Sequence, residues 1–577
     1  MTEFLINPQT IKIVNNIAAY IMLAMSAACI LRVIYIKKIL RTDLKLSKDY
    51  SRLCYKIYFA VIFIIAVATR VWSFGNAPGG FFCDEAMAAV DAKAIAEYGT
   101  DHYGMKLPVY FQAWKNGQQS IMLGYLMAPF IKLFGMSKFT VRLPMLIVST
   151  AAAICLVLLV KDMFGKKAAA AAALIVAFNP WHFLESRWAL DCYMFPHFFV
   201  FSIYFLNKSF TSEKHRKFLY ISMIFFGLTM YCYGITIYTI PVFLLIFAVY
   251  ASVKKEITIK ELLICAAIYL IVALPYILCI MVNYFQWDTI ETPFFTIPRF
   301  YETQRQNDIL FFVDNPMLQL KVNLKELFNL LILQHADNDT PAHAIAGFGT
   351  LYICTLPLAV LGLIRLFIQK NGRVRAIIIS SIVMALFGSL ITKPYTWRIA
   401  VLIYPMIILA ALGVDFIIGE FRRSQWIVLA SYAAVFVMFV STYFTTYTKT
   451  MEHWFFKGLC EAIERIEMYD ADKYYITSNT RSVDTKKESE AWTLFFHDID
   501  AHYYQGLTNE NNGKTYLPYN QRYTYGYIQP SQIDPNENAV YLISAVEKEY
   551  FDPDKYNFEE YPGVQTVYYV VTKKQGI

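Results

Sequence analysis

Long apolar runs separated by short basic segments dominate the sequence. Runs such as residues 257–282 and 399–419 approach the roughly 20 residues that a helix needs to cross a bilayer. The pattern predicts about twelve membrane-spanning helices, near residues 13–36, 57–74, 143–160, 168–182, 192–206, 218–234, 236–252, 261–282, 348–369, 376–392, 399–418 and 426–443. We therefore expect an all-α polytopic membrane protein.

One apolar stretch, residues 120–134, does not fit as a span. Its uninterrupted part has only about half the length that a bilayer requires. Counting it as a crossing would also move the basic residues near 161–167 to the opposite side from the other basic segments. The stretch is therefore predicted to be an interfacial helix on the outer surface.

The basic segments give the orientation. Lysine and arginine gather on the cytoplasmic side of membrane proteins, and here they fall in every second loop: residues 37–56, 161–167, 208–217, 254–260, 365–375 and 422–423. We expect a multi-pass plasma-membrane protein. Two large loops, residues 75–142 and 283–346, are then predicted to face away from the cytoplasm, together with everything after residue 443.

The composition changes after the last apolar run. The tail is polar and rich in tyrosine, with a helical pattern at residues 451–468 and strand patterns at 474–477, 539–544 and 566–572. Its tyrosines suit either an ordinary core or stacking on sugars. The tail is predicted to be a soluble extracytoplasmic α/β domain.

The chain is thus expected to have three parts. Residues 1–56 hold an additional N-terminal membrane helix and a cytoplasmic basic loop, residues 57–443 form the main transmembrane domain, and residues 444–577 form the soluble domain. We see no internal repeat that would change this division.

Composition and charge support a membrane protein and argue against a nucleic-acid-binding protein, a disulfide-rich protein and a cysteine metal site. Charged residues make up 17% of the chain, against roughly 25% in soluble domains, and 57% of the residues are hydrophobic. The net charge of +8 lies mostly in the orienting loops, so it does not indicate nucleic-acid binding. The ten cysteines are scattered singly, which argues against a disulfide framework or a cysteine metal cluster.

Two adjacent carboxylates, Asp84 and Glu85, begin a helical pattern in the first outer loop that stops at Gly99. Two interpretations are open. Asp84 suits a helix N-cap, where its side chain accepts backbone N–H groups. Alternatively, Asp84 and Glu85 present functional carboxylates at the membrane surface.

Several cations lie at the outer ends of spans, against the usual bias: Arg70, Lys106, Lys115, Arg142, Arg187, Lys393 and Arg398. Each alone could extend toward lipid headgroups. Together they predict a site for an anionic ligand, because guanidinium and ammonium groups suit phosphate.

The second outer loop carries a further polar group: His335, Asp337, Asp339 and His343. Histidine and aspartate are metal ligands, but their spacing matches no specific motif. The group is a candidate site for the acceptor or for a metal. No cofactor is firmly indicated, and a divalent cation is the one candidate.

Residues 57–420 resemble a known family. The order of Arg70, Asp84-Glu85, Leu-Phe-Gly-Met-Ser at 133–137 and Arg-Leu-Pro at 142–144 is similar to that of the GT-C glycosyltransferases that use polyprenyl-phosphate sugars. The group includes protein O-mannosyltransferases and the aminoarabinose transferase of lipid A. The run Asn-Pro-Trp-His at 179–182, followed by Ser-Arg at 186–187, is similar to the family's next outer turn.

The resemblance implies a GT-C fold and a glycosyltransferase activity. The donor would be a polyprenyl-phosphate-linked sugar, and the acceptor a protein, a glycolipid or a cell-wall polymer. Asp84 would be the base, with Glu85 beside it, in a transfer that inverts the anomeric carbon. The chain departs from the family at residues 115–118, where Lys-Asn-Gly-Gln stands in place of a Lys-Pro-Pro run.

Two other classes of function remain open. A transporter or flippase for a lipid-linked or cell-envelope substrate would also need many spans, although the span interiors here are nearly uncharged, with Arg32 and Asp415 toward the inner ends. A non-catalytic scaffold could use its outer tail to bind a wall polymer or a partner.

Overall fold

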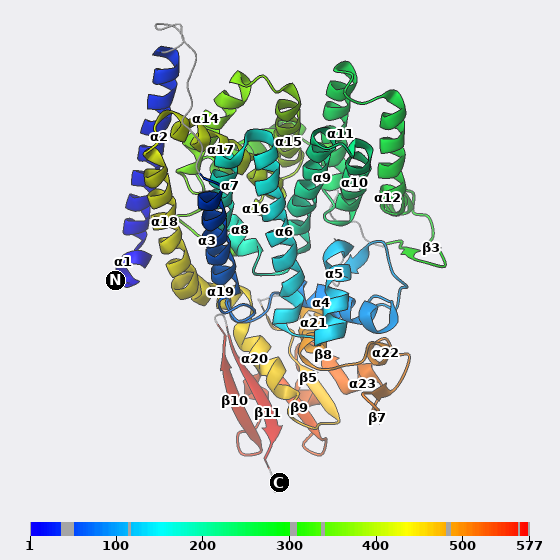
Figure 1. The fold of residues 1–577 in the computed structure, drawn as a ribbon. Helices are drawn as coiled ribbons and strands as arrows, with labels where there is room; N and C mark the ends of the chain where they lie inside the picture. Colours follow the sequence, from blue (N-terminus) through cyan, green and yellow to red (C-terminus); the bar gives the residue numbers. More distant parts are fainter. Residues whose placement is uncertain are drawn as a thin grey trace. The chain divides into compact units, whose positions relative to one another are not determined.

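The computed structural model describes residues 2–35, 51–113, 117–300, 309–335, 341–480, 486–563 and 566–574 (Figure 1). Its internal contacts divide the chain into two compact units. The first unit contains Met1–Phe74, Met145–Ile277 and Gln304–Thr446. The second contains Gly75–Pro144, Leu278–Thr303 and Tyr447–Ile577, so the first outer loop and the tail belong to one unit.

Each predicted span corresponds to a helix. They are α2 (Pro8–Ile34), α3 (Arg52–Val71), α6 (Lys138–Phe164), α7 (Lys166–Phe178), α9 (Met194–Thr211), α10 (His215–Leu228), α11 (Thr236–Val253), α12 (Ile259–Phe285), α14 (Thr355–Ile368), α15 (Gly372–Ile391), α17 (Ile403–Glu420) and α18 (Ser424–Thr442). Shorter helices of the first unit are α1 (Thr2–Ile6), α8 (Pro180–Glu185), α13 (Pro316–Leu331) and α16 (Thr396–Ile399).

Eight helical segments of the described residues are long and apolar enough to cross a membrane. The remaining predicted spans are α7, α9, α10 and α14. Three of these have only 13 or 14 residues, and α9 has 18. The polytopic all-α class is confirmed, with eight spans that meet the requirement by length and composition.

Close packing in the first unit depends on two glycines. A Cβ on Gly362 of α14 would lie 1.8 Å from the Leu409 carbonyl oxygen, and one on Gly413 of α17 would lie 2.1 Å from the Leu358 carbonyl oxygen. The backbones of α14 and α17 therefore touch, as small residues allow in membrane helix pairs.

The second unit begins with the first outer loop. This loop contains α4 (Cys83–Tyr98), the hairpin β1 (Phe111–Ala113) and β2 (Gly117–Gln119), and α5 (Ile121–Phe134). Helix α4 ends at Gly99, whose φ of 71° is a left-handed conformation that glycine adopts without strain. The predicted short helix is confirmed as α5, and its position at the membrane surface stays a prediction.

The tail forms a five-stranded mixed sheet in the order β10-β11-β9-β5-β8 (Figure 1). The strands are β5 (Lys473–Ile476), β8 (Tyr523–Tyr525), β9 (Ala539–Ser544), β10 (Tyr556–Pro562) and β11 (Val567–Lys573). Strand β5 runs parallel to β8 and β9, whereas β11 is antiparallel to β9 and β10. The predicted α/β domain is confirmed.

The second unit also contains further helices and small hairpins. They are α19 (Thr448–Trp454), α20 (Lys457–Ile466), α21 (Lys486–Phe496), α22 (Ala501–Tyr504), α23 (Tyr519–Arg522), the pair β6 (Glu510–Asn511) and β7 (Lys514–Thr515), and, in the second outer loop, β3 (Ile290–Glu291) and β4 (Thr296–Ile297). Several tyrosines, including Tyr475, Tyr541 and Tyr556, are buried in the core of the sheet.

Two details of the tail differ from the prediction. Residues 451–468 do not form one helix, because the chain breaks between α19 and α20 at Phe456, whose φ is 51°. Helical periodicity continues across such a break, so the sequence pattern does not reveal it. The prediction also missed β8 and β10, which are short or partly exposed strands with weak alternation.

Candidate functional site

Arg70 lies in the last turn of α3 and is buried, with 3% of its surface exposed. Its Nη1 donates to the Ala66 carbonyl oxygen at 3.1 Å, and its Nη2 lies 3.2 Å from His182 Nδ1. Its Nε finds no hydrogen-bond partner among the described residues. A buried guanidinium with an unused donor is suited to an anionic ligand.

Arg187 stabilises the end of α3. Its Nη1 donates to the carbonyl oxygens of Thr69 (3.3 Å) and Arg70, and its Nη2 donates to that of Trp72 at 2.9 Å. Its Nε donates to the Tyr443 hydroxyl at 3.0 Å. A cation at a helix C-terminus satisfies the free carbonyl groups there. Arg187 therefore positions the turn that carries Arg70.

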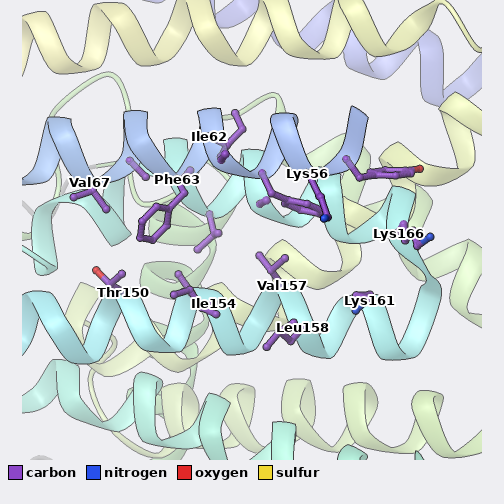
Figure 2. A pocket seen from close by; sticks show the side chains of 18 of the residues that line it. Lys56, Ile62, Phe63, Val67, Thr150, Ile154, Val157, Leu158, Lys161 and Lys166 are labelled. Atoms are coloured by element: carbon purple, nitrogen blue, oxygen red, sulfur yellow. The ribbon is translucent and has the colours of Figure 1, made fainter. Parts of the chain in front are cut away.

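An apolar groove of about 540 Å³ runs along α3, α6 and α7 in the first unit. Its lining is almost entirely aliphatic and aromatic between two charged ends. Lys56, Lys161 and Lys166 gather at one end, whereas Val67 and Thr150 lie toward the other (Figure 2).

Arg70 and His182 also line this groove, as does Arg52 at the opposite end of α3. Arg52 and Arg70 are separated by about 27 Å along an ideal helix, close to the thickness of the hydrocarbon core of a bilayer. The groove therefore has the length and the lining of a site for a lipid chain, with cations at both ends.

A buried polar network lies behind Arg70. His197 Nε2 is 2.8 Å from Glu185 Oε2, and His197 Nδ1 is 2.8 Å from the Tyr404 hydroxyl. Glu185 Oε1 has no partner within the described residues and lies 4.0 Å from His182 Nε2. The Glu185 carboxyl group thus joins His182 and His197 in one buried polar cluster.

Glu185, His197 and Tyr404 were not among the predicted site residues. The available signal was an ionisable side chain within or beside an apolar run, which is costly in a membrane and usually has a functional or structural partner. Glu185 ends α8, and His197 lies in the first turn of α9.

Lys393 and Arg398 lie together in the first unit. Both stack on Tyr395, with their charged groups 4.8 and 5.2 Å from the ring centroid, and Arg398 Nη1 donates to the Lys393 carbonyl oxygen at 3.1 Å. The structure thus brings these two predicted cations together.

The predicted polar group of the second loop is only partly described. His335 is exposed, while His343 is buried, contacts Trp188 and Trp397, and is hydrogen-bonded to the Tyr193 hydroxyl. Burial lowers the pKa of His343 to about 3, so its ring is neutral. Asp337 and Asp339 lie outside the described residues. Within the described part of the chain, no three histidine, cysteine or acidic side chains form a group that could hold a metal ion.

Glu85 and Arg142 form a buried ion pair in the second unit. Arg142 Nε donates to Glu85 Oε1 at 2.8 Å, and Arg142 Nη2 donates to Glu85 Oε2 at 2.9 Å, with both side chains fully buried. Arg142 Nη1 also donates to the Gly75 carbonyl oxygen at 3.3 Å. This two-bond geometry is the strongest arrangement for these groups, and it fixes the first turn of α4 against the start of α6.

Asp84 differs from its neighbour because it is exposed. It is the second residue of α4, and the N-cap is Phe82, so the N-cap interpretation of Asp84 is wrong. Asp84 Oδ1 lies 3.6 Å from Cys83 Sγ, and Gln119 Nε2 donates to the Asp84 backbone carbonyl oxygen at 3.4 Å.

The remaining predicted cations of the second unit have separate positions. Lys106 is exposed, and its Nζ donates to the Pro293 carbonyl oxygen at 2.9 Å. Lys115 lies outside the described residues.

Comparisons with known proteins match this architecture. Residues 118–278 match the family described as dolichyl-phosphate-mannose-protein mannosyltransferase. The structure is similar to that of ArnT from Cupriavidus metallidurans in the apo state, with a TM-score of 0.52 and 12% identity over 90% of this chain and 98% of ArnT. The comparison with curated proteins finds no significant match.

A second structure, of ArnT from Cupriavidus metallidurans bound to undecaprenyl phosphate, matches with a TM-score of 0.53 and 12% identity, again over 90% of this chain and 98% of that chain. These matches confirm the predicted resemblance at the level of the fold. The chain therefore has the GT-C-like fold of ArnT, and its segment 118–278 matches the dolichyl-phosphate-mannose-protein mannosyltransferase family.

Proposed function

We propose that this protein is a membrane glycosyltransferase that transfers a sugar from a polyprenyl-phosphate donor to an acceptor outside the cytoplasm. The observation that carries the proposal is the apolar groove of the first unit, which has the nearly buried Arg70 at one end. A long apolar chain with one phosphate group fits that combination. The ArnT structure of the same fold has undecaprenyl phosphate bound.

In this proposal, α3, α6 and α7 hold the isoprenoid chain of the donor, and Arg70 binds its phosphate. The Nε of Arg70 is the available donor, since its other nitrogens are engaged with Ala66 and His182. Arg187 keeps the end of α3 in place. Lys393 and Arg398 add positive charge for the leaving phosphate, as do Lys106 and Lys115.

Asp84 acts as the base. The acceptor hydroxyl attacks the anomeric carbon while Asp84 takes its proton, and the bond from that carbon to the phosphate oxygen breaks. The departing polyprenyl phosphate carries the electron pair and is stabilised by cations. A phosphate is already a good leaving group, so no second carboxylic acid is needed to protonate it, unlike in glycoside hydrolysis. Attack from the face opposite the phosphate inverts the anomeric centre.

The contacts of the two adjacent carboxylates support the choice of Asp84. Both oxygens of Glu85 accept hydrogen bonds from Arg142, and the Glu85 side chain is buried. Asp84 is exposed, so an acceptor hydroxyl can approach it. Glu85 and Arg142 are then positioning residues that fix the first turn of α4.

The donor site is tested by measuring the binding of undecaprenyl phosphate to the purified protein by native mass spectrometry. Arg70→Gln should raise the Kd at least about tenfold, because a charged hydrogen bond to phosphate is lost. The matched control is Arg365→Gln, which changes an arginine of α14 that does not line the groove. Equal affinity in Arg70→Gln and the wild type would rule out this donor site.

The proposed orientation places the second unit outside the cytoplasm. It is tested with single cysteines at Lys45 and Asn512 and an impermeant thiol reagent on intact cells. Labelling is expected at position 512 and not at 45, and the reverse pattern would refute the orientation.

A role for a divalent cation near His335, Asp337 and Asp339 predicts that EDTA abolishes transfer and that added metal restores it.

A further inference from the structure

A polar cavity of about 310 Å³ lies in the second unit, at one edge of the tail's sheet. Its wall combines aromatic rings with hydrogen-bonding groups. The residues that carry the argument are Asp498, Asn511, Asn512, Lys514, Tyr516 and Arg522. The volume falls at the lower end of the range for small-molecule sites in proteins, about 300–1,000 Å³.

Arg522, at the end of α23, is the unusual residue of this wall. Its side chain is only 5% exposed, and its guanidinium lies 3.6 Å from the ring centroid of Tyr516. Its Nη2 donates to the Ala471 carbonyl oxygen at 3.4 Å, and its Nε has no hydrogen-bond partner in the described part of the chain. Buried donors are normally hydrogen-bonded, so this unused donor in a cavity wall favours a ligand that supplies an oxygen acceptor.

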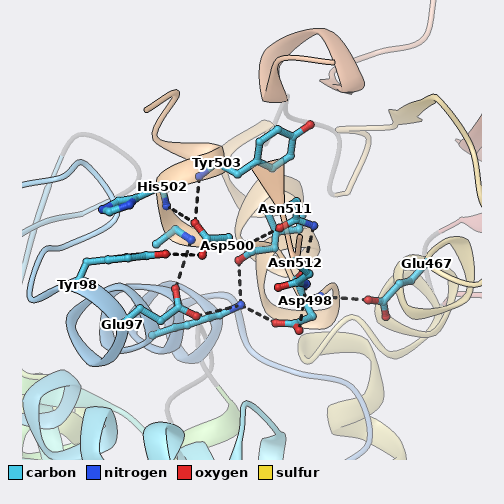
Figure 3. A network of polar contacts seen from close by, with 12 residues as sticks. Glu97, Tyr98, Glu467, Asp498, Asp500, His502, Tyr503, Asn511 and Asn512 are labelled. Atoms are coloured by element: carbon cyan, nitrogen blue, oxygen red, sulfur yellow. Dashed lines mark hydrogen bonds and ion pairs between the residues drawn. The ribbon is translucent and has the colours of Figure 1, made fainter. Parts of the chain in front are cut away.

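Asp498, Asn511 and Asn512, which also line the cavity, are held by the network of polar contacts in Figure 3. Lys93 Nζ is 2.9 Å from Asp498 Oδ1, and Asn512 Nδ2 donates to the Asp498 carbonyl oxygen at 2.7 Å and to its Oδ2 at 3.2 Å. Glu467 Oε1 accepts the backbone N–H of Asp498 at 3.1 Å. These contacts fix a carboxylate and the β6–β7 turn at the rim, and such preorganisation favours binding.

The lining selects one chemical class. It offers acceptors (the Asp498 carboxylate and the Asn511 carbonyl group) and donors (Lys514 and Arg522) around the ring of Tyr516. A sugar presents hydroxyl groups that both donate and accept, together with a C–H face that packs on an aromatic ring. A lipid chain has no acceptor for the buried Nε of Arg522, and leaving that donor unpaired is costly.

We propose that this cavity is a saccharide-binding subsite that holds a sugar residue of the acceptor glycan, an assignment of acceptor class that rests on the proposed glycosyltransferase function. Arg522 Nε and Lys514 donate to sugar oxygens, Asp498 accepts from a hydroxyl, and Tyr516 packs against the ring. The acceptor is therefore a glycan or glycolipid that the protein holds at a residue away from the reacting hydroxyl.

The test uses saturation-transfer NMR on the full-length protein in a detergent without a sugar headgroup. The probes are glucose, mannose, galactose, N-acetylglucosamine and glucuronic acid. The wild type should give a signal with at least one sugar, and Arg522→Gln and Lys514→Ala should reduce it at least fivefold. Lys514 is exposed, so its replacement leaves the fold intact even if Arg522→Gln destabilises the domain.

The matched control is Lys555→Ala, which removes an exposed lysine that does not line the cavity, and it should leave the signal unchanged. No signal with any sugar in the wild type would overturn the proposal. An equal signal in the wild type, Arg522→Gln and Lys514→Ala would also overturn it, because the sugar would then bind elsewhere.

Undecaprenyl phosphate binding, measured on the same samples, separates this proposal from the function on which it rests. Lipid binding that persists in Lys514→Ala while the sugar signal falls supports the subsite. Sugar binding in a wild type that binds no undecaprenyl phosphate would contradict the donor proposal and leave the subsite standing.

Discussion

The groove of the first unit and the cavity of the second unit differ in how charged and apolar groups are distributed along their walls. The groove is long and apolar, and its charges are confined to its ends. The cavity is smaller and mixes carboxylate, amide, ammonium, guanidinium and aromatic groups throughout its wall. The first arrangement suits a lipid chain with one phosphate, and the second suits a sugar. In our two proposals, the lipid-linked donor and the glycan acceptor therefore bind to different regions of the chain.

A second contrast separates the charged residues that stabilise the fold from those that are available for a substrate. Arg142 donates two hydrogen bonds to Glu85 in a buried ion pair. Arg187 donates its hydrogen bonds to backbone carbonyl groups and to the Tyr443 hydroxyl. Arg70 and Arg522 each retain an unpaired Nε within the described structure. Arg365 and Arg375 also have an unpaired Nε among the described residues, but they line neither the groove nor the cavity. The unused donor together with a place in the wall of the groove or the cavity therefore distinguishes the two classes.

The largest effect is expected from breaking the pair of Glu85 and Arg142. Glu85→Gln or Arg142→Gln leaves the other charge buried without its partner, which typically costs about 3–5 kcal/mol. The melting temperature should therefore fall strongly in either variant. The double variant Glu85→Gln/Arg142→Gln should be less destabilised than the sum of the two single changes. Additive losses would show that the two side chains do not act as a pair.

The next effect concerns catalysis without a change in stability. Asp84→Asn should reduce turnover by roughly a hundredfold or more, because an amide cannot take the acceptor's proton. Its melting temperature should stay near that of the wild type, since Asp84 is exposed and is not the N-cap. The control is Asp554→Asn, an exposed carboxylate in a turn of the tail. Near wild-type turnover in Asp84→Asn would place the base elsewhere.

A smaller effect should depend on pH and involve the loop after α4. Burial, followed by the nearby Asp91 carboxylate, raises the pKa of Asp101 to about 6. Between about pH 4 and pH 6 the folded state therefore keeps a proton that the unfolded chain has lost, so stability falls as the pH rises through this window.

Asp101→Asn should remove up to about 2 kcal/mol of this pH dependence. The amide oxygen can still accept the backbone N–H groups of Tyr103 and Met105, which Asp101 Oδ1 accepts at 3.0 and 2.8 Å. Unfolding is followed at pH 4.5 and 7.5. An unchanged pH dependence in Asp101→Asn would contradict the assignment to this carboxyl group.

The smallest effect comes from filling the groove. Ala60→Trp places a large ring in the groove and should weaken undecaprenyl phosphate binding about tenfold, which is about 1.4 kcal/mol. Ile64→Trp, on the same helix but not lining the groove, is the matched control and should bind like the wild type. Equal affinities would mean that the chain of the lipid binds elsewhere.

The sequence predicted the architecture better than it predicted the site. Helix positions followed from hydrophobic runs that span a bilayer, and the strands β5, β9 and β11 followed from their branched and aromatic residues. The roles of Arg142 and Arg187 could not be predicted, because their partners come from distant positions such as Glu85 and Tyr443. Helical periodicity also gave no sign of the break at Phe456, which is a property of one residue's backbone.

The cavity around Arg522 was equally hidden. The sequence showed a tyrosine-rich tail in which core packing and sugar binding were both open. The structure separates the two groups, with Tyr541 and Tyr556 in the core and Tyr516 on the cavity wall. Such a division depends on the sheet order, which brings the end of α20, the β6–β7 turn and α23 together.

The most direct test of the central claim is the release of free polyprenyl phosphate. Membranes from cells that lack the protein supply both the lipid-linked sugars and the acceptors, and purified protein is added in detergent so that no gradient exists. Mass spectrometry then measures polyprenyl phosphate. We expect the wild type to release polyprenyl phosphate and Asp84→Asn not to release it. No release by the wild type, with transport of a lipid-linked substrate in sealed vesicles instead, would contradict a glycosyltransferase.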